Sequence, residues 1–184
     1  MIEQAIKKAR AEDIEAKFFI HDMRKIKLNQ VFHCAISLRG SFPRLIDEDD
    51  FKLFFEGLSS HLISRGLFIF DFINADGVVP GHRDWKIKEK GNLAVIRLDR
   101  ADFRKELNLL EEYHEFFVME GDNLTNRWKE THRLRTHGIG EIEGTLRKYR
   151  FDLLKPRANV AEKVDSDKLQ KQPFAIRAIA RKSD

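Results

Sequence analysis

Alternation of apolar and polar residues predicts strands in the first half of this chain. The segment 30–38 places four apolar residues on one face, as a half-buried strand requires: Phe32, Cys34, Ile36 and Leu38. Two shorter alternating runs, 84–89 and 93–98, are joined by Lys90-Gly91-Asn92 and predict a hairpin. Between these regions the run 67–73, LFIFDFI, is apolar on both faces and predicts a central strand covered on both sides.

Helical spacing of apolar residues follows in other segments. The segment 47–65 opens on acidic residues and carries an apolar stripe at helical spacing: Phe51, Phe54, Phe55, Leu58 and Leu62. The segment 99–119 carries a second such stripe, Phe103, Leu107, Leu110, His114 and Phe117, with Asp99 as its cap. Further helices are expected over 2–17 and 124–135, and a last strand over 145–154.

Together these elements predict an α+β fold. We expect a mixed or antiparallel sheet of about four to five strands, covered by the two strong amphipathic helices, with a basic distal helix and a C-terminal arm. Residues 1–154 would form a single α+β domain. Residues 155–184 would form a linker and the C-terminal arm, because the composition becomes polar and proline-containing before the short apolar piece 174–180, FAIRAIA.

Charge is unevenly distributed along the 184 residues. Residues 1–123 carry a net charge of −3 and residues 124–184 a net charge of +7, within a total of +4. No apolar run is long enough to cross a bilayer, so no membrane association is expected. Cys34 is the single cysteine, which excludes an intrachain disulfide and fits a cytoplasmic protein.

The basic C-terminal third favours a non-enzymatic binding or regulatory module for an anionic partner, most simply nucleic acid. Cations would neutralise phosphates and an aromatic ring would stack on a base. A solvated basic surface, or one paired with acidic residues of a partner subunit, is the structural alternative. The residues of this predicted interface are Arg127, Trp128, Lys129, Arg133, Arg135, Arg147, Lys148 and Arg150.

A carboxylate inside the apolar run gives a second hypothesis. Asp71 must be paired, hydrogen-bonded, metal-bound or protonated there. With Asp84-Trp85-Lys86 on the next expected strand, the local order resembles metal-dependent nucleases with a PD-(D/E)xK signature, although Asp71 lies inside the first of the three strands. The resemblance implies a phosphodiesterase in which Asp71 and Asp84 hold Mg²⁺ and Lys86 steadies the nucleophile. Under the other hypotheses no cofactor is expected.

Other residues carry less chemistry. His61 and His114 lie on or beside apolar stripes, where each is a buried general base or a core histidine with one hydrogen bond. Cys34 is expected to be a small buried hydrophobe. Histidine spacing predicts no metal site. A third hypothesis is a homo-oligomeric interaction protein, a homodimer formed through the C-terminal arm.

Overall fold

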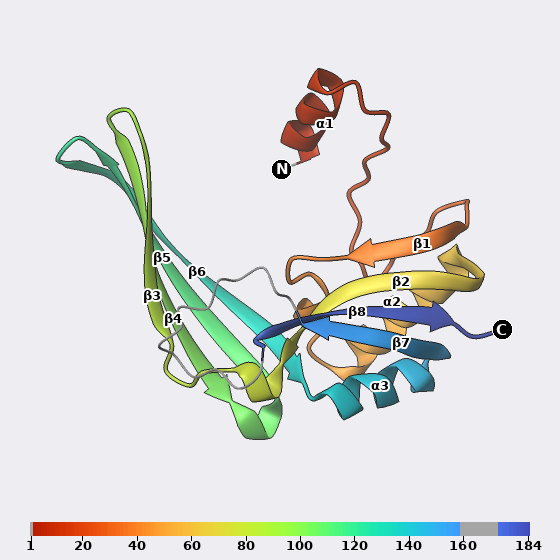
Figure 1. The fold of residues 1–184 in the computed structure, drawn as a ribbon. Coiled ribbons are helices and arrows are strands. Elements are labelled where there is room, and N and C mark those ends of the chain that lie inside the picture. The colour runs from red at the N-terminus through yellow and green to blue at the C-terminus, as the bar shows by residue number, and fades with distance from the viewer. Residues whose placement is uncertain (1, 159–172) are drawn as a thin grey trace.

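Two sheets that meet at an angle make up the molecule. The computed structural model describes residues 2–158 and 173–184. One sheet has the order β1-β2-β8-β7, and the other is the antiparallel meander β3-β4-β5-β6 (Figure 1). The strands are β1 (Phe32–Ser37), β2 (Leu62–Asn74), β3 (Arg83–Lys90), β4 (Leu93–Arg104), β5 (Leu109–Glu120), β6 (Asn123–His137), β7 (Phe151–Ala158) and β8 (Ala175–Lys182). The α-helices are α1 (Ile2–Ala11), α2 (Glu48–His61) and α3 (Ile139–Lys148), and short 3-10 turns lie at Phe42–Arg44, Ala75–Gly77 and Lys105–Leu107.

The core of the first sheet is rich in phenylalanine. Phe68, Phe70 and Phe72 alternate along β2 and point to one face, where α2 and α3 cover them. Helix α2 begins at its cap Asp47, whose side chain accepts a hydrogen bond from the backbone N–H of Asp50. Phe42 is fully buried, and its ring contacts five other rings of the core: Phe51, Phe54, Phe55, Phe68 and Phe70. Helices therefore bury one face of this sheet.

Strand β6 joins the two sheets. Most of β6 pairs with β5, but its last two residues, Thr136 and His137, pair in parallel with Ile73 and Asn74 at the end of β2. A second, smaller core lies at this junction and consists of Ile73, Ala101, Leu110 and Leu134. The position of the meander is therefore fixed by the ends of β2 and β6.

The sequence predictions for the first half are close to the structure. The expected strand at 30–38, helix at 47–65, strand at 67–73 and hairpin after residue 83 correspond to β1, α2, β2 and the pair β3–β4. The expected helices at 99–119 and 124–135 are wrong, because these residues form β4, β5 and β6. Glutamate and leucine have high intrinsic helix propensity, but pairing of β5 with strands on both sides outweighs it.

The expected fold class is also wrong. Eight strands and three α-helices are present among the described residues, rather than four to five strands under two strong helices. The basic distal helix is strand β6, and the last strand expected at 145–154 is largely the end of α3 followed by β7. None of the helices in the described residues is long and apolar enough to span a membrane.

The C-terminal arm is a strand of the sheet. β8 lies between β2 and β7 and pairs with both, and its residues Ile176, Ala178 and Ala180 are buried against the phenylalanine face. Both edges of β8 are used within the sheet, so β8 offers no free edge to another subunit. The predicted linker at 159–172 lies outside the described residues.

Replacement of Phe42 by alanine tests the phenylalanine core. We expect Phe42→Ala to lower the free energy of unfolding by about 3–5 kcal/mol, because it removes a fully buried ring and leaves a cavity. Leu107→Ala, at a residue that is 59% exposed, should change it by less than about 0.5 kcal/mol. Urea unfolding of both variants measures this, and equal losses would contradict the assignment of the core.

Candidate functional site

One face of the meander carries a polar cluster above an apolar base. Residues paired across antiparallel strands share a face, so the register defines successive rows. The first row, Phe103, Leu110 and Leu134, packs at the junction with β2. The next rows on the same face are Ala101, Glu112 and His132, then Asp99, His114 and Glu130, then Arg97, Phe116 and Trp128. We call this surface the inner face, because its base packs against Ile73 of β2.

His114 is the centre of the cluster. Its Nδ1 lies 2.6 Å from Oδ1 of Asp99, and Arg97 donates from Nη2 to the second oxygen of Asp99 at 2.7 Å. The side chains of His114 and Asp99 are 13% and 12% exposed, so both are largely removed from solvent. This contact directs the Nδ1 proton to Asp99 and leaves Nε2 as the free atom of the ring.

The Asp99 carboxylate is stabilised in its charged form. Burial by itself raises its pKa, but the hydrogen bonds from His114 and Arg97 outweigh burial and hold the pKa below the ordinary value. Asp99 is therefore an anion that orients the imidazole of His114.

Two further groups approach the free side of His114. Oε2 of Glu112 lies 3.6 Å from His114 Nε2, and the ring centroids of His114 and His132 are 5.1 Å apart. Glu112, His114 and His132 can each offer one ligand atom, all within 4.8 Å of one another. A carboxylate with two imidazoles is a donor set that zinc or ferrous iron accepts. The same donors can hold an ammonium group or accept a proton.

Aromatic side chains lie beyond the cluster. Phe116 and Trp128 stack with centroids 4.7 Å apart and planes inclined by 5°. A groove of about 590 Å³ is lined mainly by residues of the opposite face of the meander, among them Arg100, Tyr113 and Glu115. Asp99, His114 and Glu130 line it as well. Glu115 is already paired there with Arg127 and Lys129. The inner face therefore combines an oriented imidazole, carboxylates and an aromatic platform.

Asp71 is held by two backbone N–H groups of the loop after β1. Its two oxygens accept hydrogen bonds from the backbone N–H groups of Arg39, at 2.5 Å, and Gly40, at 3.0 Å. Arg39 and Gly40 both have positive φ, so the loop after β1 turns sharply at this point. Asp71 thus fixes the loop at the carboxyl end of β1.

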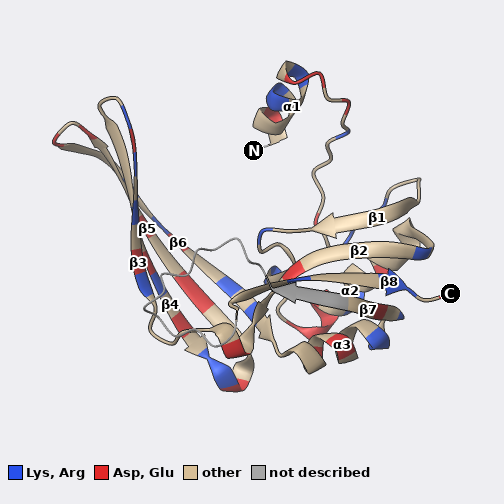
Figure 2. Ribbon diagram, viewed as in Figure 1, with Lys and Arg blue, Asp and Glu red and all other residues tan. Residues whose placement is uncertain are grey.

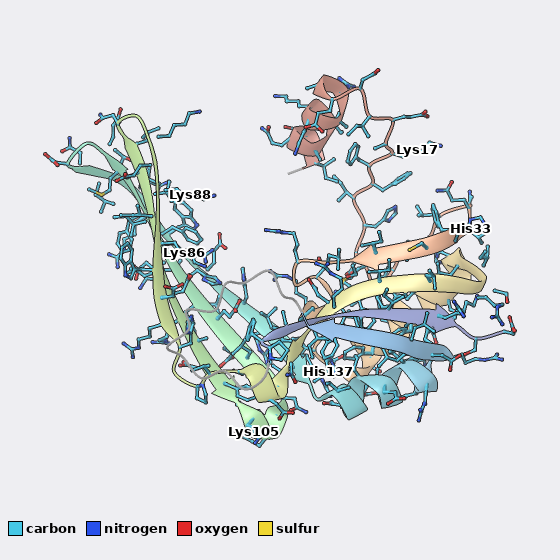
Figure 3. All side chains as sticks on the ribbon, viewed as in Figure 1. Lys17, His33, Lys86, Lys88, Lys105 and His137 are labelled. Carbon is cyan, nitrogen blue, oxygen red and sulfur yellow. The ribbon has the colours of Figure 1, made fainter. Side chains whose placement is uncertain are left out.

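The other two residues of the nuclease hypothesis lie elsewhere. Asp84 and Lys86 are exposed on β3, at the far edge of the meander, and pair with each other at 3.8 Å. Figure 3 labels Lys86 and its neighbour Lys88 on this strand. Strands β4, β5 and β6 separate them from Asp71 on β2, so the structure does not bring the three residues together.

The predicted basic interface is dispersed among ion pairs. On the outer face of β6, Arg127 and Lys129 pair with Glu115, Arg133 with Glu111, and Arg135 with Glu141. Trp128 points to the inner face and donates to Glu130. Arg147 pairs with Glu143, Lys148 pairs with Glu48, and Arg150 donates to the carbonyl oxygen of Asp184. Figure 2 accordingly shows basic and acidic residues interspersed along the meander.

The remaining sequence candidates have structural explanations. His61 ends α2, where its Nδ1 contacts the carbonyl oxygen of Gly57 and its Nε2 accepts from the N–H of Leu28. Cys34 is exposed, so its expected burial is wrong.

A buried histidine lies at the junction of the two sheets. His137, labelled in Figure 3, is 1% exposed, and neither of its ring nitrogens has a hydrogen-bond partner among the described residues. Its Nδ1 lies 3.6 Å from Oε1 of Glu141. This contact, together with Arg135 and the N–H of Gly138, lowers the pKa of Glu141 to about 2 against the opposing effect of burial.

Sequence reasoning found His114 but missed its partners. The sequence pattern places these partners on predicted helices: Asp99, Glu112, Glu130 and His132. In a helix, residues two apart do not share a face, whereas in the observed strands they do. The alternation of Leu110, Glu112, His114 and Phe116 is the signal that could have placed them on one face of a strand.

Comparison with solved structures gives the fold a known counterpart. A S-adenosylmethionine-dependent methyltransferase from Clostridium acetobutylicum ATCC 824 superposes with a TM-score of 0.79 at 22% identity, covering 100% of this chain and 71% of that one. The amino pentose methyltransferase CalS10 of Micromonospora echinaspora gives a TM-score of 0.70 at 12% identity, covering 89% and 63%. The sugar N-methyltransferase KedS8 of Streptoalloteichus sp ATCC 53650 gives 0.71 at 15%, covering 89% and 61%. No family model and no curated protein matches the sequence.

These matches show the fold and correct several predictions. The proteins that share it are methyltransferases, which overturns the hypothesis of a non-enzymatic module for nucleic acid. They lend no support to the nuclease or the homo-oligomeric interaction protein. CalS10 was solved with S-adenosylmethionine bound, so the expectation of no cofactor is also corrected. The chain spans 61–71% of the length of these three proteins.

The described residues do not complete a site for S-adenosylmethionine. In doubly wound α/β sheets, ligands bind outside the carboxyl ends of parallel strands, at the point where strand order reverses. β1 and β2 supply parallel strands on one side of such a point, but no described strand lies beyond β1. The described residues thus share the fold of these solved structures but supply parallel strands on only one side of such a crevice.

Removal of the Asp71 carboxylate tests its role in positioning the loop. Asp71→Ala leaves two backbone donors without their acceptor, and we expect a loss of about 2 kcal/mol in the free energy of unfolding. Amide exchange at residues 39–41 should accelerate as well. Asp102→Ala, which removes an exposed ion pair with Arg100, should change stability by less than about 0.5 kcal/mol. An unchanged exchange rate at the loop would contradict this role.

The depressed pKa of Glu141 predicts a specific pH dependence. The charged form contributes stability above the ordinary pKa of 4.5, and this contribution is lost as pH falls toward about 2. We expect Glu141→Gln to melt below the wild type at neutral pH and to converge with it between pH 4.5 and 2. Glu143→Gln, on the exposed side of α3, should show no comparable gap. Calorimetry across this range measures the gap, and a constant difference down to pH 2 would refute the assignment.

Proposed function

We propose that this chain forms the acceptor-binding part of a S-adenosylmethionine-dependent methyltransferase that acts on the amine of a small molecule. The observation that carries the proposal is the His114–Asp99 pair on the inner face of the meander. The neighbours CalS10 and KedS8 are an amino pentose methyltransferase and a sugar N-methyltransferase, which supports an amine as the acceptor.

His114 is placed to accept the proton of the acceptor. An aliphatic amine is protonated near neutral pH and has no lone pair for a new bond until a base removes the proton. Asp99 holds Nδ1 of His114, so Nε2 is directed to the open side of the cluster. A positioned base of this kind contributes about 10²–10⁴ in rate.

The surroundings of His114 fit an amino sugar. Glu112 and Glu130 provide carboxylate oxygens on the same face, which attract the ammonium form of the acceptor. The stacked Phe116 and Trp128 offer an apolar surface in the next row for the carbon face of a sugar ring.

The expected cytoplasmic location remains part of this proposal, since the free, exposed Cys34 suits a reducing compartment.

Binding of amines tests the proposal directly. Isothermal titration with a panel of amino sugars, in the presence of EDTA, should detect a ligand for the wild-type chain. For that ligand, Glu112→Gln should weaken binding by about tenfold, because it removes a charge that faces the ammonium group. Tyr113→Phe, at the next residue but on the opposite face, is the matched control and should bind as the wild type does.

Two results would count against it. If no amine of the panel binds, or if Glu112→Gln binds as tightly as Tyr113→Phe, the inner face is not an acceptor site. Binding that is absent in EDTA but present when the titration is repeated without EDTA would instead identify Glu112, His114 and His132 as ligands of a metal ion.

A further inference from the structure

The edge of the first sheet at β1 is unprotected. β1 pairs in parallel with β2, and no described strand pairs with its other side. Strands β3, β7 and most of β6 also have a free edge, and each carries charged residues that block edge-to-edge pairing: β3 reads RDWKIKEK, β6 contains Arg127, Lys129 and Arg133, and β7 contains Asp152. β1 reads FHCAIS and contains no Asp, Glu, Lys, Arg or proline. Its edge therefore lacks the features that keep strand edges from pairing.

The face of this sheet opposite the phenylalanine core is uncovered. The register places Cys34, Ile36, Leu67 and Ile69 on that face, with Ile179 of β8 beside them. Ile36 on this face is 66% exposed. The described helices that pack on this sheet, α2 and α3, both lie on the phenylalanine face.

The N-terminal segment is attached only from Asp22 onward. Met23 packs on the core, and Arg24 pairs with Asp50 of α2 at 2.7 Å. Before this point an extended segment, 14–21, exposes Phe18, Phe19 and Ile20, the last by 85%. Helix α1 buries none of its described residues and stands clear of both sheets (Figure 1). Phenylalanine and isoleucine have high β-propensity, so 14–21 has the composition of a strand without a neighbour.

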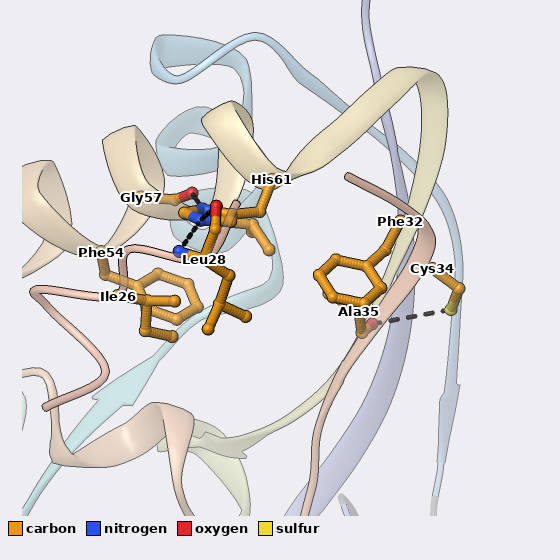
Figure 4. A pocket seen from close by; sticks show the side chains of 9 residues that line it. Ile26, Leu28, Phe32, Cys34, Ala35, Phe54, Gly57 and His61 are labelled. Carbon is orange, nitrogen blue, oxygen red and sulfur yellow. Dashed lines mark hydrogen bonds between the residues drawn. The ribbon is translucent and has the colours of Figure 1, made fainter. Parts of the chain in front are cut away.

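A hollow lies beside β1. It has a volume of about 250 Å³ and is lined by Ile26, Leu28, Phe32, Ala35, Phe54 and Leu58, between β1 and α2 (Figure 4). Its lining is almost wholly apolar. The ring nitrogens of His61, which also lines it, already bond to the backbone of Leu28 and Gly57. Four features therefore lie around β1: its free edge, the uncovered face of the sheet, the extended segment 14–21 and this hollow.

We propose that the β1 edge binds an α/β segment from outside residues 1–184, which adds strands parallel to β1 and a helix over the face of Ile36 and Ile69. The outermost added strand would pair with 14–21. The Clostridium acetobutylicum enzyme superposes on the whole chain, including α1 and the extended segment, and nearly a third of that enzyme has no counterpart here. A segment that lies in space between β1 and 14–21 would account both for the full coverage of this chain and for the unmatched part of that enzyme. This inference rests on the fold and not on the proposed activity.

Completion of the sheet would also complete the crevice for the cofactor. Strands beyond β1 bring a reversal of strand order next to the loop that Asp71 holds. The chain alone is therefore expected not to bind S-adenosylmethionine, whereas the assembled protein is expected to bind it.

Amide exchange of the chain, alone and mixed with a probe segment, tests the proposal. The probe is the part of the Clostridium acetobutylicum enzyme that has no counterpart in this chain. In the chain alone, amides of 14–21 should exchange as in an unfolded peptide. The probe should slow exchange at 14–21 and at β1 by at least about tenfold. In a titration, S-adenosylmethionine should bind to the mixture but not to the chain by itself.

A pair of variants separates docking from folding. Ile36→Asp puts a charge on the bare face and should abolish the protection and the cofactor binding, with an unchanged circular dichroism spectrum. Leu107→Asp, at a residue of similar exposure in the turn between β4 and β5, should retain both.

Four results would overturn the proposal: protection of 14–21 in the monomeric chain alone, protection that arises from self-association, cofactor binding by the chain alone, or no protection by the probe. Light scattering during the exchange experiment identifies self-association. None of these readings depends on binding of an amine, so failure here and failure of the proposed function are distinguishable.

Discussion

Strand β2 is the element on which the rest of the structure depends. It pairs with β1 on one side and β8 on the other, and its last residues pair with β6. Phe68, Phe70 and Phe72 on one face hold α2 and α3, while Asp71 on the other face fixes the loop after β1. A single strand thus fixes the helices, the loop and the position of the second sheet relative to the first.

The inner face of the meander gains its chemistry from this arrangement. Its apolar base packs against Ile73 of β2, and the next rows rise from that base with carboxylates and imidazoles in register. Asp99 is largely buried and is kept ionised by His114 and Arg97. A buried anion that fixes the orientation of an imidazole is an arrangement suited to proton transfer.

The features left without a partner gather on the other side of the molecule. Where β3 and β7 have charged residues on strands with a free edge, β1 has no Asp, Glu, Lys or Arg, and the bare face beside it holds Ile36 and Ile69. Burial of such surface is favourable in water, so a structure that leaves it open has affinity for a matching segment. Binding of the cofactor and binding of the acceptor would then reside on different segments of polypeptide.

The sequence by itself determined where β1, α2, β2 and the β3–β4 hairpin lie, because local periodicity is enough to mark these elements. It did not determine which face of β1 is buried, since Ala35 packs on the core whereas Cys34 and Ile36 are exposed. It also marked Asp71 as a carboxylate that needs partners, and His114 as a candidate base. Only the tertiary structure decided that 99–119 and 124–135 are strands, since pairing with distant neighbours outweighed the helix propensity of their glutamates and leucines. It alone supplied Asp99, Glu112 and His132 as neighbours of His114, and the backbone donors of Arg39 and Gly40 for Asp71, because contacts between residues far apart in sequence arise only when strands align.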